Sequence, residues 1–519
     1  MNAPKLSMRE RLVRPTLAEL WLFLAVALPV LASVIAAMST VDLAYQLRAG
    51  AEILGGSGLP SVDTWTFTAT GLPWFDQQWA GQVLLAQVFT TAGWTGLVLL
   101  RAILAGLVSG LILAAIRYRA PRLQPRSASV LTLAAFVIYA PALALRPQLL
   151  AMVLFALTLF LLVARRRHPR VILAVPLVAA VWANVHGSFV LAPILAGMAL
   201  VDGTGDPDAR GLATILRRSR REIAVLMATV MATFATPFGW RVWEYAFGIA
   251  RNSQITTQIS EWQPPRFDDV PGLLFWTSVG VALFAVALLV RRGYRVHAGA
   301  VIGLVLFAAL GAMASRGAAW WPGVALVAVL GIWSDHPSTL TVEPGSASGT
   351  TRRRTLNAGV GALLVAVVIA LVPVWRPIDA GTDAPAGILA DAPSGITGAL
   401  RSIAQPGDRV WNPQVWGSWL EFAVPDALYA LDSRIEVIPA GAWADAAVVT
   451  AGDPGWADIL ALAQVNVIIT EGRTSPLATA LAASPDWTVA YADDDGTIWL
   501  AAGADGVTVR SDGRGEVRA

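Results

Sequence analysis

Long apolar runs recur along most of the chain, and short stretches rich in arginine separate them. A helix needs about 20 mostly apolar residues to cross the hydrocarbon layer of a membrane, and this length criterion predicts about eleven membrane-spanning helices. They are expected at residues 17–39, 94–116, 127–145, 149–164, 171–185, 187–202, 222–238, 271–290, 297–314, 318–334 and 355–374. The segment 77–92 is also apolar but short and rich in glutamine, so we expect it to lie along the membrane interface.

The positions of the arginines predict the orientation of these helices. Cytoplasmic loops of membrane proteins carry an excess of Lys and Arg. If 77–92 does not span, every basic cluster falls on the side of the N-terminus, which is therefore predicted to be cytoplasmic. The clusters lie at residues 5–14, 117–126, 165–170, 210–221, 291–295 and 352–354. The first apolar run is long enough to span and no small-residue cleavage site follows it, so we interpret it as a retained helix.

Composition agrees with a membrane protein and excludes several other classes. Hydrophobic residues make up 56% of the chain, charged residues 14%, and the mean hydropathy is +0.60. Soluble globular domains carry about 25% charged residues, so a single soluble domain or a disordered chain is a poor interpretation. The net charge of +3 argues against a nucleic-acid partner. The sequence has no cysteine, which excludes disulfides, zinc–thiolate sites and thiol nucleophiles.

Residues 376–519 differ in composition from the rest of the chain. They are richer in acidic groups and alternate short apolar strands with helical stretches, as in 457–464, 465–470 and 487–502, the last a hairpin around an Asp-Asp-Gly turn. The predicted fold is therefore mainly α: a polytopic membrane module at 1–375, with a first external loop at 40–93, and a small external α/β domain at 376–505. Residues 506–519 are polar and expected to be disordered.

The loops predicted on the outer side hold most of the polar residues that could take part in catalysis or ligand binding. Polar groups at or below the outer membrane boundary are costly unless they face a cavity, and so they are functional candidates. For Arg101 the alternative is snorkelling to lipid headgroups. For most of the 21 tryptophans the alternative is an interfacial aromatic belt. For the cluster of Trp411, Trp416, Trp419 and Asp432–Arg434 the alternative is core packing around one ion pair.

Several short motifs occur in a fixed order along the chain. They are D-L-x-x-Q-L-R-A-G at 42–50, P-S-V-D-T-W-T-F at 60–67, R-P-Q-L at 146–149, W-A-N-V-H-G-S-F at 182–189, T-P-F-G-W-R at 236–241, E-W-Q-P-P at 261–265, W-G-S-W-L at 416–420 and L-D-S-R at 431–434. With the layout described above, they resemble the GT-C superfamily of integral-membrane glycosyltransferases, in a bacterial, actinobacterial branch. The resemblance covers most of the chain.

The resemblance implies a sugar donor linked to a polyprenyl phosphate, an external active site in the bacterial plasma membrane, and an aspartate base just after the first helix. Asp42 occupies that place. Many members pair this residue with a neighbouring carboxylate, whereas Leu43 follows here, so a partner has to come from Asp63 or Glu52. Use of a divalent cation, Mg²⁺ or Mn²⁺, is left open by this departure.

The chemistry of such a transfer assigns roles to the remaining candidates. A base must take a proton from the acceptor hydroxyl, and cations must stabilise the departing phosphate, for which the arginine fork is suited. A single displacement would invert the anomeric centre. The expected catalytic carboxylates are Asp42 and Asp63, and the expected phosphate ligands are Arg101, Arg146, His186, Arg241 and Arg316. Sugar or acceptor contacts are expected from Gln46, Arg48, Trp65, Trp74, Gln148, Asn184, Glu261 and Trp262.

Two other classes of function remain open from the sequence. A flippase or transporter for a lipid-linked glycan would favour polar residues in the middle of several spans, but 149–164, 271–290 and 355–374 are nearly free of them. A non-catalytic protein of envelope assembly would use the outer domain to bind a partner or a glycan. The acceptor itself is expected to be a glycan, lipid or protein of the cell envelope.

Overall fold

A computed structural model describes residues 15–204, 219–252, 256, 259–336, 351–502, 510–511 and 517–518. The predicted basic cluster at 5–14, three arginines of the next loops (Arg210, Arg217 and Arg218) and most of the tail at 506–519 lie outside the described residues. The chain forms two compact units. Unit 1 comprises Met1–Ile35, Val98–Arg251 and Thr256–Val372, and unit 2 comprises Ala36–Leu97, Asn252–Ile255 and Pro373–Ala519.

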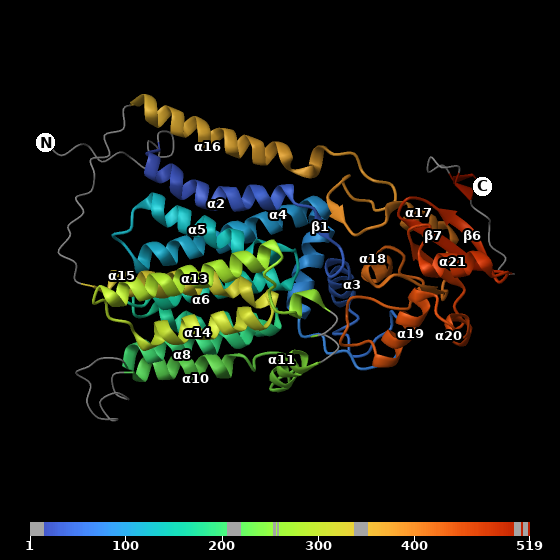
Figure 1. Cartoon of the computed structure of the whole chain (residues 1–519), viewed down its shortest axis with the longest axis horizontal. Coiled ribbons are helices and arrows are strands. Elements are labelled where there is room, and N and C mark those ends of the chain that lie inside the picture. Colours follow the sequence, from blue (N-terminus) through green and yellow to red (C-terminus); the bar gives the residue numbers. More distant parts are fainter. Residues whose placement is uncertain are drawn as a thin grey trace. The chain divides into compact units, whose positions relative to one another are not determined.

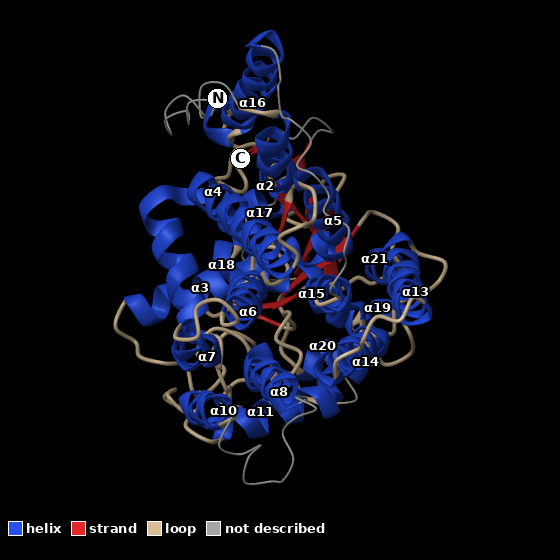
Figure 2. Ribbon diagram, turned by 90° about the vertical axis from the view of Figure 1, so that its left-hand side faces the viewer, coloured by secondary structure: helices blue, strands red, loops and turns tan. Residues whose placement is uncertain are grey.

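Unit 1 is a bundle of long helices that run side by side (Figure 1), and Figure 2 looks along them. The apolar runs predicted from the sequence form most of these helices. They are α2 (Leu17–Ile35), the part of α4 (Trp79–Arg119) from Val98 onward, α5 (Pro125–Tyr139), α6 (Pro147–Ala164), α7 (Val175–Ala183), α8 (Leu191–Thr204), α10 (Arg220–Ala232), α11 (Arg241–Arg251), α13 (Val270–Arg291), α14 (Ala298–Met313), α15 (Trp321–Ser334) and α16 (Thr351–Leu371).

Seven helical segments among the described residues are long and apolar enough to cross a membrane, and three shorter apolar helices accompany them. Helices α13 and α16 turn large apolar side chains outward: Phe284 is 65% exposed and Leu363 is 65% exposed. Apolar surfaces of this extent are rare on soluble proteins and indicate contact with lipid. The chain is thus a multi-pass membrane protein, while the full set of about eleven spans stays a prediction.

Short 3-10 helices shape the tight turns between the long helices of unit 1. They are η1 (Ala140–Leu143), η2 (Val171–Ala174), η3 (Gly187–Val190), η4 (Ser260–Trp262) and η5 (Ser315–Trp320). Five of the described α-helices of unit 1 begin with proline in their first turn, where its missing N–H costs no hydrogen bond: α5, α6, α7, α13 and α15. Asp269 caps α13 by accepting a hydrogen bond from the N–H of Gly272 at 2.6 Å. These turns position the polar residues of the candidate site.

Helix α4 is bent at one glycine. Gly93 has φ 58° and ψ −156°, a backbone conformation outside the helical range. Only glycine adopts such a conformation without steric cost. The break falls between the predicted interfacial segment 77–92 and the predicted span 94–116.

Unit 2 is built around a five-stranded sheet with the order β4-β3-β5-β7-β6. Its strands are β3 (Arg409–Trp411), β4 (Leu428–Tyr429), β5 (Val467–Glu471), β6 (Trp487–Ala492) and β7 (Gly496–Ala501). Strand β3 is parallel to β4 and β5, whereas β7 is antiparallel to β5 and β6. The predicted strand at 465–470 and the predicted hairpin at 487–502 are confirmed as β5 and β6–β7.

Helices and short strand pairs complete unit 2. The helices are α3 (Leu43–Leu54), α17 (Ser394–Ile403), α18 (Gln414–Ala423), α19 (Ala440–Ala451), α20 (Trp456–Leu462) and α21 (Pro476–Ala483), with η6 (Pro373–Trp375) at the start of the C-terminal part. Strand β1 (Met38–Ser39) pairs in parallel with β2 (Leu389–Ala390), and β8 (Arg510–Ser511) pairs with β9 (Val517–Arg518).

The predicted first external loop packs within unit 2 rather than with the helical bundle. Residues beside Thr66 pair with strand β4: the N–H of Phe67 donates to the carbonyl of Tyr429 at 3.0 Å, and the N–H of Tyr429 donates to the carbonyl of Trp65 at 3.1 Å. Thr68 Oγ1 donates to the carbonyl of Ala430 at 2.5 Å. The loop therefore extends the edge of the sheet at strand β4. Its place in unit 2 differs from the domain boundary at residue 375 that composition led us to expect.

Candidate functional site

The structure brings together several of the predicted phosphate and sugar ligands at one place in unit 1. Arg316 donates from its NH2 group to Gln148 Oε1 at 3.1 Å, and its guanidinium lies 4.7 Å from the ring centre of Trp262. Arg146 forms an ion pair with Glu261 at 2.5 Å. We call Arg146, Gln148, Glu261, Trp262 and Arg316 the arginine cluster.

The tight turns of the bundle explain why these residues meet. Arg146 is the extended residue that precedes α6, and Gln148 lies in the first turn of that helix. Glu261 and Trp262 belong to η4, and Arg316 belongs to η5. Ser315 joins the last two elements, because its N–H and its hydroxyl both donate to the carbonyl of Gln263 at 2.9 Å. Three separate turns therefore contribute to one polar site.

A small cavity of about 90 Å³ opens beside this cluster. Its polar lining comes from Arg146, Gln148, Glu261, Ser315 and Arg316, and the rest of its wall is apolar. The side chain of Arg146 is 15% exposed, whereas that of Glu261 is 40% exposed. Two guanidinium groups at a partly apolar cavity form a site suited to a small anion such as a phosphate group.

His186 belongs to the same site electrostatically. Burial, and then the charges of Arg316 and Arg146, hold the pKa of His186 well below its usual value, so the imidazole is neutral. Its Nδ1 accepts a hydrogen bond from the N–H of Ser188 at 3.1 Å. The remaining proton of the neutral ring is therefore on Nε2, which is available as a donor.

The other candidates of unit 1 lie elsewhere. Neither Arg101 nor Arg241 lines the cavity. Arg101 is 3% exposed in the middle of α4, so protein side chains cover it, while Arg241 is an exposed residue at the start of α11. Asn184 uses its amide to hold two turns together, since Nδ2 donates to the carbonyls of Ala180 and Ala235, both at 2.8 Å. This geometry fits a structural role for Asn184.

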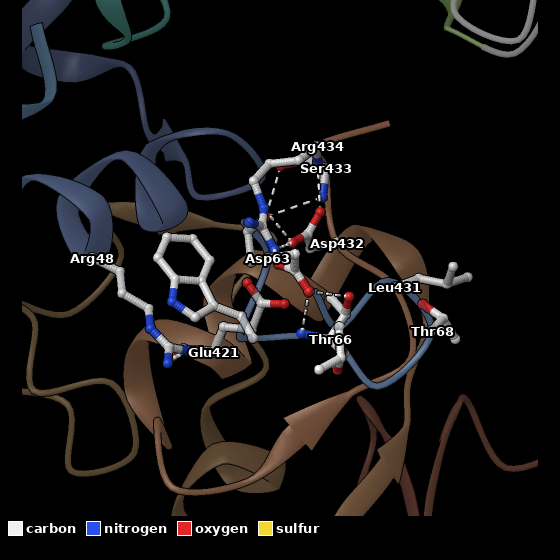
Figure 3. A network of polar contacts seen from close by, with 12 residues as sticks. Arg48, Asp63, Thr66, Thr68, Glu421, Leu431, Asp432, Ser433 and Arg434 are labelled. Atoms are coloured by element: carbon white, nitrogen blue, oxygen red, sulfur yellow. Dashed lines mark hydrogen bonds and ion pairs between the residues drawn. The ribbon is translucent and has the colours of Figure 1, made fainter. Parts of the chain in front are cut away.

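In unit 2 the predicted carboxylate Asp63 lies inside a buried ionic network (Figure 3). Its Oδ2 accepts hydrogen bonds from Thr66, at 3.0 Å from the backbone N–H and 2.7 Å from the hydroxyl. Its Oδ1 accepts from Arg434 NH2 at 2.6 Å, and Arg434 Nε also donates to Asp432 Oδ2 at 2.6 Å. Both oxygens of Asp63 are engaged and the residue is 0% exposed. This setting is structural and differs from the catalytic role expected.

Two predicted sugar contacts are part of the same core. The Arg434 guanidinium lies 4.3 Å from the ring centre of Trp65 and 4.5 Å from that of Trp74. Trp65 is 1% exposed and Trp74 is 6% exposed, so neither face is open to a sugar. The sequence expectation fails here because charged neighbours in a loop do not reveal that a distant arginine buries both rings.

Two further residues predicted to contact sugar or acceptor, Gln46 and Arg48, belong to helix α3 of unit 2. Arg48 donates to the carbonyl of Glu421 at 2.9 Å and to Glu52 Oε1 at 3.2 Å. Gln46 is 1% exposed and donates to the hydroxyl of Tyr45 at 2.5 Å and, outside the helix, to Gln78 Oε1 at 3.3 Å. Both side chains therefore fasten α3 within unit 2.

Asp42 is the half-buried residue at the N-terminus of α3, and its side chain does not cap that helix. Burial raises the pKa of Tyr45 well above its usual value, and the carboxylates of Asp42, Glu436, Asp76 and Asp432 raise it further. Four acidic residues therefore surround Tyr45. Asp42 is the more accessible of the two predicted catalytic carboxylates.

Asp76 is a second carboxylate with unusual surroundings, and it was not among the predicted site residues. It is 3% exposed, its Oδ1 accepts from Gln82 Nε2 at 2.6 Å, and its Oδ2 has no hydrogen-bond partner among the described residues. Burial raises the pKa of Asp76 from 3.8 to about 7, against the opposing effect of the Gln82 hydrogen bond. The only feature of the sequence that could have drawn attention to Asp76 is its position just before a glutamine-rich segment.

The raised pKa of Asp76 predicts a pH-dependent stability. Between pH 4 and pH 7 the folded chain keeps a proton that the unfolded chain has released, so the free energy of unfolding falls as pH rises through this window. We expect Asp76→Asn to remove this part of the slope, as measured by thermal unfolding of the purified chain at pH 5 and pH 8. Asp391→Asn, at an exposed carboxylate of the same unit, should leave the slope unchanged.

Within the described part of the chain, no group of three or more His, Asp or Glu residues has a geometry that could hold a metal ion. The sequence leaves open whether the protein uses Mg²⁺ or Mn²⁺, and the described residues do not offer a set of ligands for either ion.

No protein-family model and no curated protein sequence matches the chain. Among solved structures, it is similar to the oligosaccharyltransferase of Archaeoglobus fulgidus in the apo form, with 11% identity and a TM-score of 0.52 over 95% of this chain and 76% of that one. The same enzyme tethered to an acceptor peptide with an NVT sequon gives 13% identity and a TM-score of 0.50, over 87% and 68% of the two chains.

A third similar structure is ArnT from Cupriavidus metallidurans bound to undecaprenyl phosphate, with 16% identity, a TM-score of 0.47 and coverage of 93% and 98%. Identities this low establish the fold and not the activity. The predicted resemblance is thereby confirmed at the level of architecture: the chain has the fold of the GT-C membrane glycosyltransferases.

Proposed function

We propose that the chain is a membrane glycosyltransferase that moves a sugar from a polyprenyl-phosphate-type lipid donor to a cell-envelope acceptor on the external face of the bacterial plasma membrane. The observation that carries this proposal is the arginine cluster with its cavity and the neutral His186. The GT-C fold supports it, as does the name of the similar oligosaccharyltransferase, which in one of its structures is tethered to an acceptor peptide.

The arginine cluster has the properties that binding a lipid phosphate requires. A phosphate has several strong acceptor oxygens, and each guanidinium can satisfy two of them at once. Arg146 and Arg316 border the cavity, whereas His186 does not line it and is linked to the two arginines only by the effect of their charges on its pKa. The cavity of about 90 Å³ suits the phosphate group alone, so sugar and lipid chain would extend beyond it.

The transfer itself needs one base and one leaving group. In the proposed step, Asp42 takes the proton of the acceptor hydroxyl, whose oxygen bonds to the anomeric carbon of the donor. The bond from that carbon to the phosphate oxygen breaks at the same time, and the phosphate leaves with the electron pair. Arg146 and Arg316 stabilise the negative charge that builds on this phosphate. A single displacement of this kind inverts the anomeric centre.

The orientation predicted from the arginines belongs to this proposal. The basic loops lie on the cytoplasmic side, and the turns that hold the arginine cluster, together with the C-terminal domain, lie outside. A donor carried by a lipid then reaches the site from the outer leaflet.

Phosphate binding is tested most simply with polyprenyl phosphate as a probe of the full-length protein. We expect Arg316→Gln to weaken its binding about 10-fold to 100-fold, because a hydrogen bond to a charged group contributes about 1.5–3 kcal/mol. Binding is measured as the amount of radiolabelled polyprenyl phosphate that stays bound to the full-length protein in detergent solution. Arg266→Gln is the matched control, since Arg266 is 72% exposed and pairs with Asp268 in the neighbouring loop.

Glu261 supplies a second variant with an effect of opposite sign. Its carboxylate pairs with the Arg146 guanidinium at 2.5 Å and so competes with a phosphate for that group. Its negative charge also repels a phosphate that approaches the same cavity. We therefore expect Glu261→Gln to strengthen polyprenyl phosphate binding while Arg316→Gln weakens it. Equal binding by both variants and by the wild type would contradict the assignment of this cavity to the phosphate.

A further inference from the structure

Unit 2 contains a second hollow that the proposed transfer does not use. This open groove has a volume of about 470 Å³ and lies at the bend of α4. It is formed by residues 89–95 of α4, by the loop 378–385, and by Arg401 of α17 with Phe422 of α18. Its volume falls in the range of about 300–1,000 Å³ that is usual for small-molecule sites.

One part of the groove wall is apolar and rigidly packed, while Thr95, Thr382, Asp383 and Arg401 make the rest of it polar. The ring of Phe89 packs edge-on against Trp94 and against Phe422, with ring centres 4.9 Å and 5.6 Å apart. Trp94 also packs on Trp419, the ring centres 6.0 Å apart, and on the other side Ile378 is 63% exposed. Aromatic rings packed in this way leave apolar edges toward the groove, which suit a hydrocarbon chain better than the hydroxyl groups of a sugar.

The rim of the groove carries one cation and one anion side by side. Arg401 pairs with Asp383 at 2.8 Å, and their side chains are 33% and 67% exposed. The loop before Asp383 is fixed by Asp379, whose Oδ1 accepts from the N–H and the hydroxyl of Thr382 at 2.9 Å and 2.8 Å. The hydroxyl of Ser394 donates to the same oxygen at 2.5 Å. Asp383 is thus held on an ordered loop, beside Arg401 of helix α17.

The position on α4 points to a lipid. The groove lies at Gly93, where the segment predicted to follow the membrane interface meets the segment predicted to span. Polar lipid headgroups lie at that depth of the membrane, so a groove at this point of the helix can meet one. The adjacent charges complement a headgroup with a phosphate and a primary ammonium, whereas a headgroup with only a phosphate would face the carboxylate of Asp383.

We propose that this groove binds one phospholipid of the phosphatidylethanolamine type, with its phosphate at Arg401, its ammonium at Asp383 and one acyl chain along Phe89 and Phe422. The site is separate from the arginine cluster and does not depend on the proposed transfer. It gives the C-terminal residues of unit 2 a direct contact with the outer leaflet.

The experiment uses the full-length protein in detergent, stripped of native lipid and offered phosphatidylethanolamine or phosphatidylglycerol in mixed micelles. Native mass spectrometry counts the lipids that remain on each chain. We expect the wild type to retain one more phosphatidylethanolamine molecule per chain than Arg401→Gln does. The affinity of the variant for this lipid should be at least tenfold lower. Arg473→Gln is the control, because Arg473 forms an exposed pair with Asp494 at 3.8 Å in the same unit.

Asp383→Asn separates headgroup recognition from general lipid binding. Removing this carboxylate should weaken phosphatidylethanolamine binding and strengthen phosphatidylglycerol binding, a change of sign that a loss of folding cannot produce. Equal retention of both lipids by the wild type and both variants would overturn the proposal. Loss of polyprenyl phosphate binding in Arg401→Gln, with phosphatidylethanolamine retention unchanged, would overturn it too and assign the groove to the donor.

Discussion

Replacing Arg434 by alanine is expected to destabilise unit 2 by about 3–5 kcal/mol, the usual cost of removing one partner from a buried ion pair. Arg434 is 1% exposed and pairs with both Asp63 and Asp432, which are 0% exposed. Without the guanidinium, two carboxylates remain in the core with no counter-charge. The cation–π contacts of Arg434 with Trp65 and Trp74 are lost at the same time.

The effect of Arg434→Ala is measured as the thermal unfolding midpoint of the full-length protein, and as proteolytic cleavage within residues 60–76. Arg473→Ala is the matched control, because Arg473 is 56% exposed and its pair with Asp494 is 3.8 Å long. Exposed pairs of this kind contribute about 0–1 kcal/mol. Arg434→Lys should fall between the two, since lysine keeps the charge but loses the planar fork. A wild-type midpoint in Arg434→Ala would show that the network does not hold the loop.

The second large effect is expected at Asp42. Asp42→Asn keeps the size of the side chain but cannot accept a proton, so it should lower the rate of sugar transfer about 10²-fold to 10⁴-fold, the usual contribution of a general base. Binding of polyprenyl phosphate should not change, because Asp42 is assigned to the acceptor hydroxyl. The measurement is the turnover of the purified protein on a polyprenyl-phosphate hexose, with Asp391→Asn as the control at an exposed carboxylate beside β1.

The two carboxylates near α3 can be told apart by the same assay. Asp76→Asn is expected to change the pH dependence of stability and to leave turnover within a few-fold of the wild type. If Asp76→Asn abolished transfer while Asp42→Asn did not, the base would be Asp76, and the assignment made from the resemblance would be wrong.

Helix positions in the bundle follow closely from the sequence, because a run of apolar residues long enough to span has few alternatives to a helix. The predicted spans at 149–164 and 271–290 correspond to α6 (Pro147–Ala164) and α13 (Val270–Arg291). The structure brings Arg146, Gln148, Glu261 and Arg316 together from three of the turns predicted on one side of the bundle. Arg241 and Asn184, from the same predicted side, do not line that cavity, so the pattern alone did not select the members of the cluster.

The setting of Asp63 could not be read from the sequence. Its partner Arg434 lies 371 residues away, and nothing local distinguishes a carboxylate that is neutralised in a core from one that is open to a substrate. The same holds for Trp65 and Trp74, which are buried by that arginine. The pKa of Asp76 is raised by burial, which depends on the tertiary fold, although its hydrogen-bond partner Gln82 is local in the sequence.

The central claim is that the chain breaks the bond between a sugar and a lipid phosphate. The direct measurement incubates the full-length protein in proteoliposomes with a polyprenyl phosphate linked to a radiolabelled hexose and with a cell-envelope fraction as the source of acceptor hydroxyl groups. It follows the released polyprenyl phosphate and the labelled product that receives the hexose. Cleavage by the wild type, inverted anomeric configuration in the product, and loss of cleavage in an Arg146→Gln, Arg316→Gln double variant are the results expected. Movement of the intact labelled lipid across the bilayer without cleavage would contradict the claim and identify a flippase.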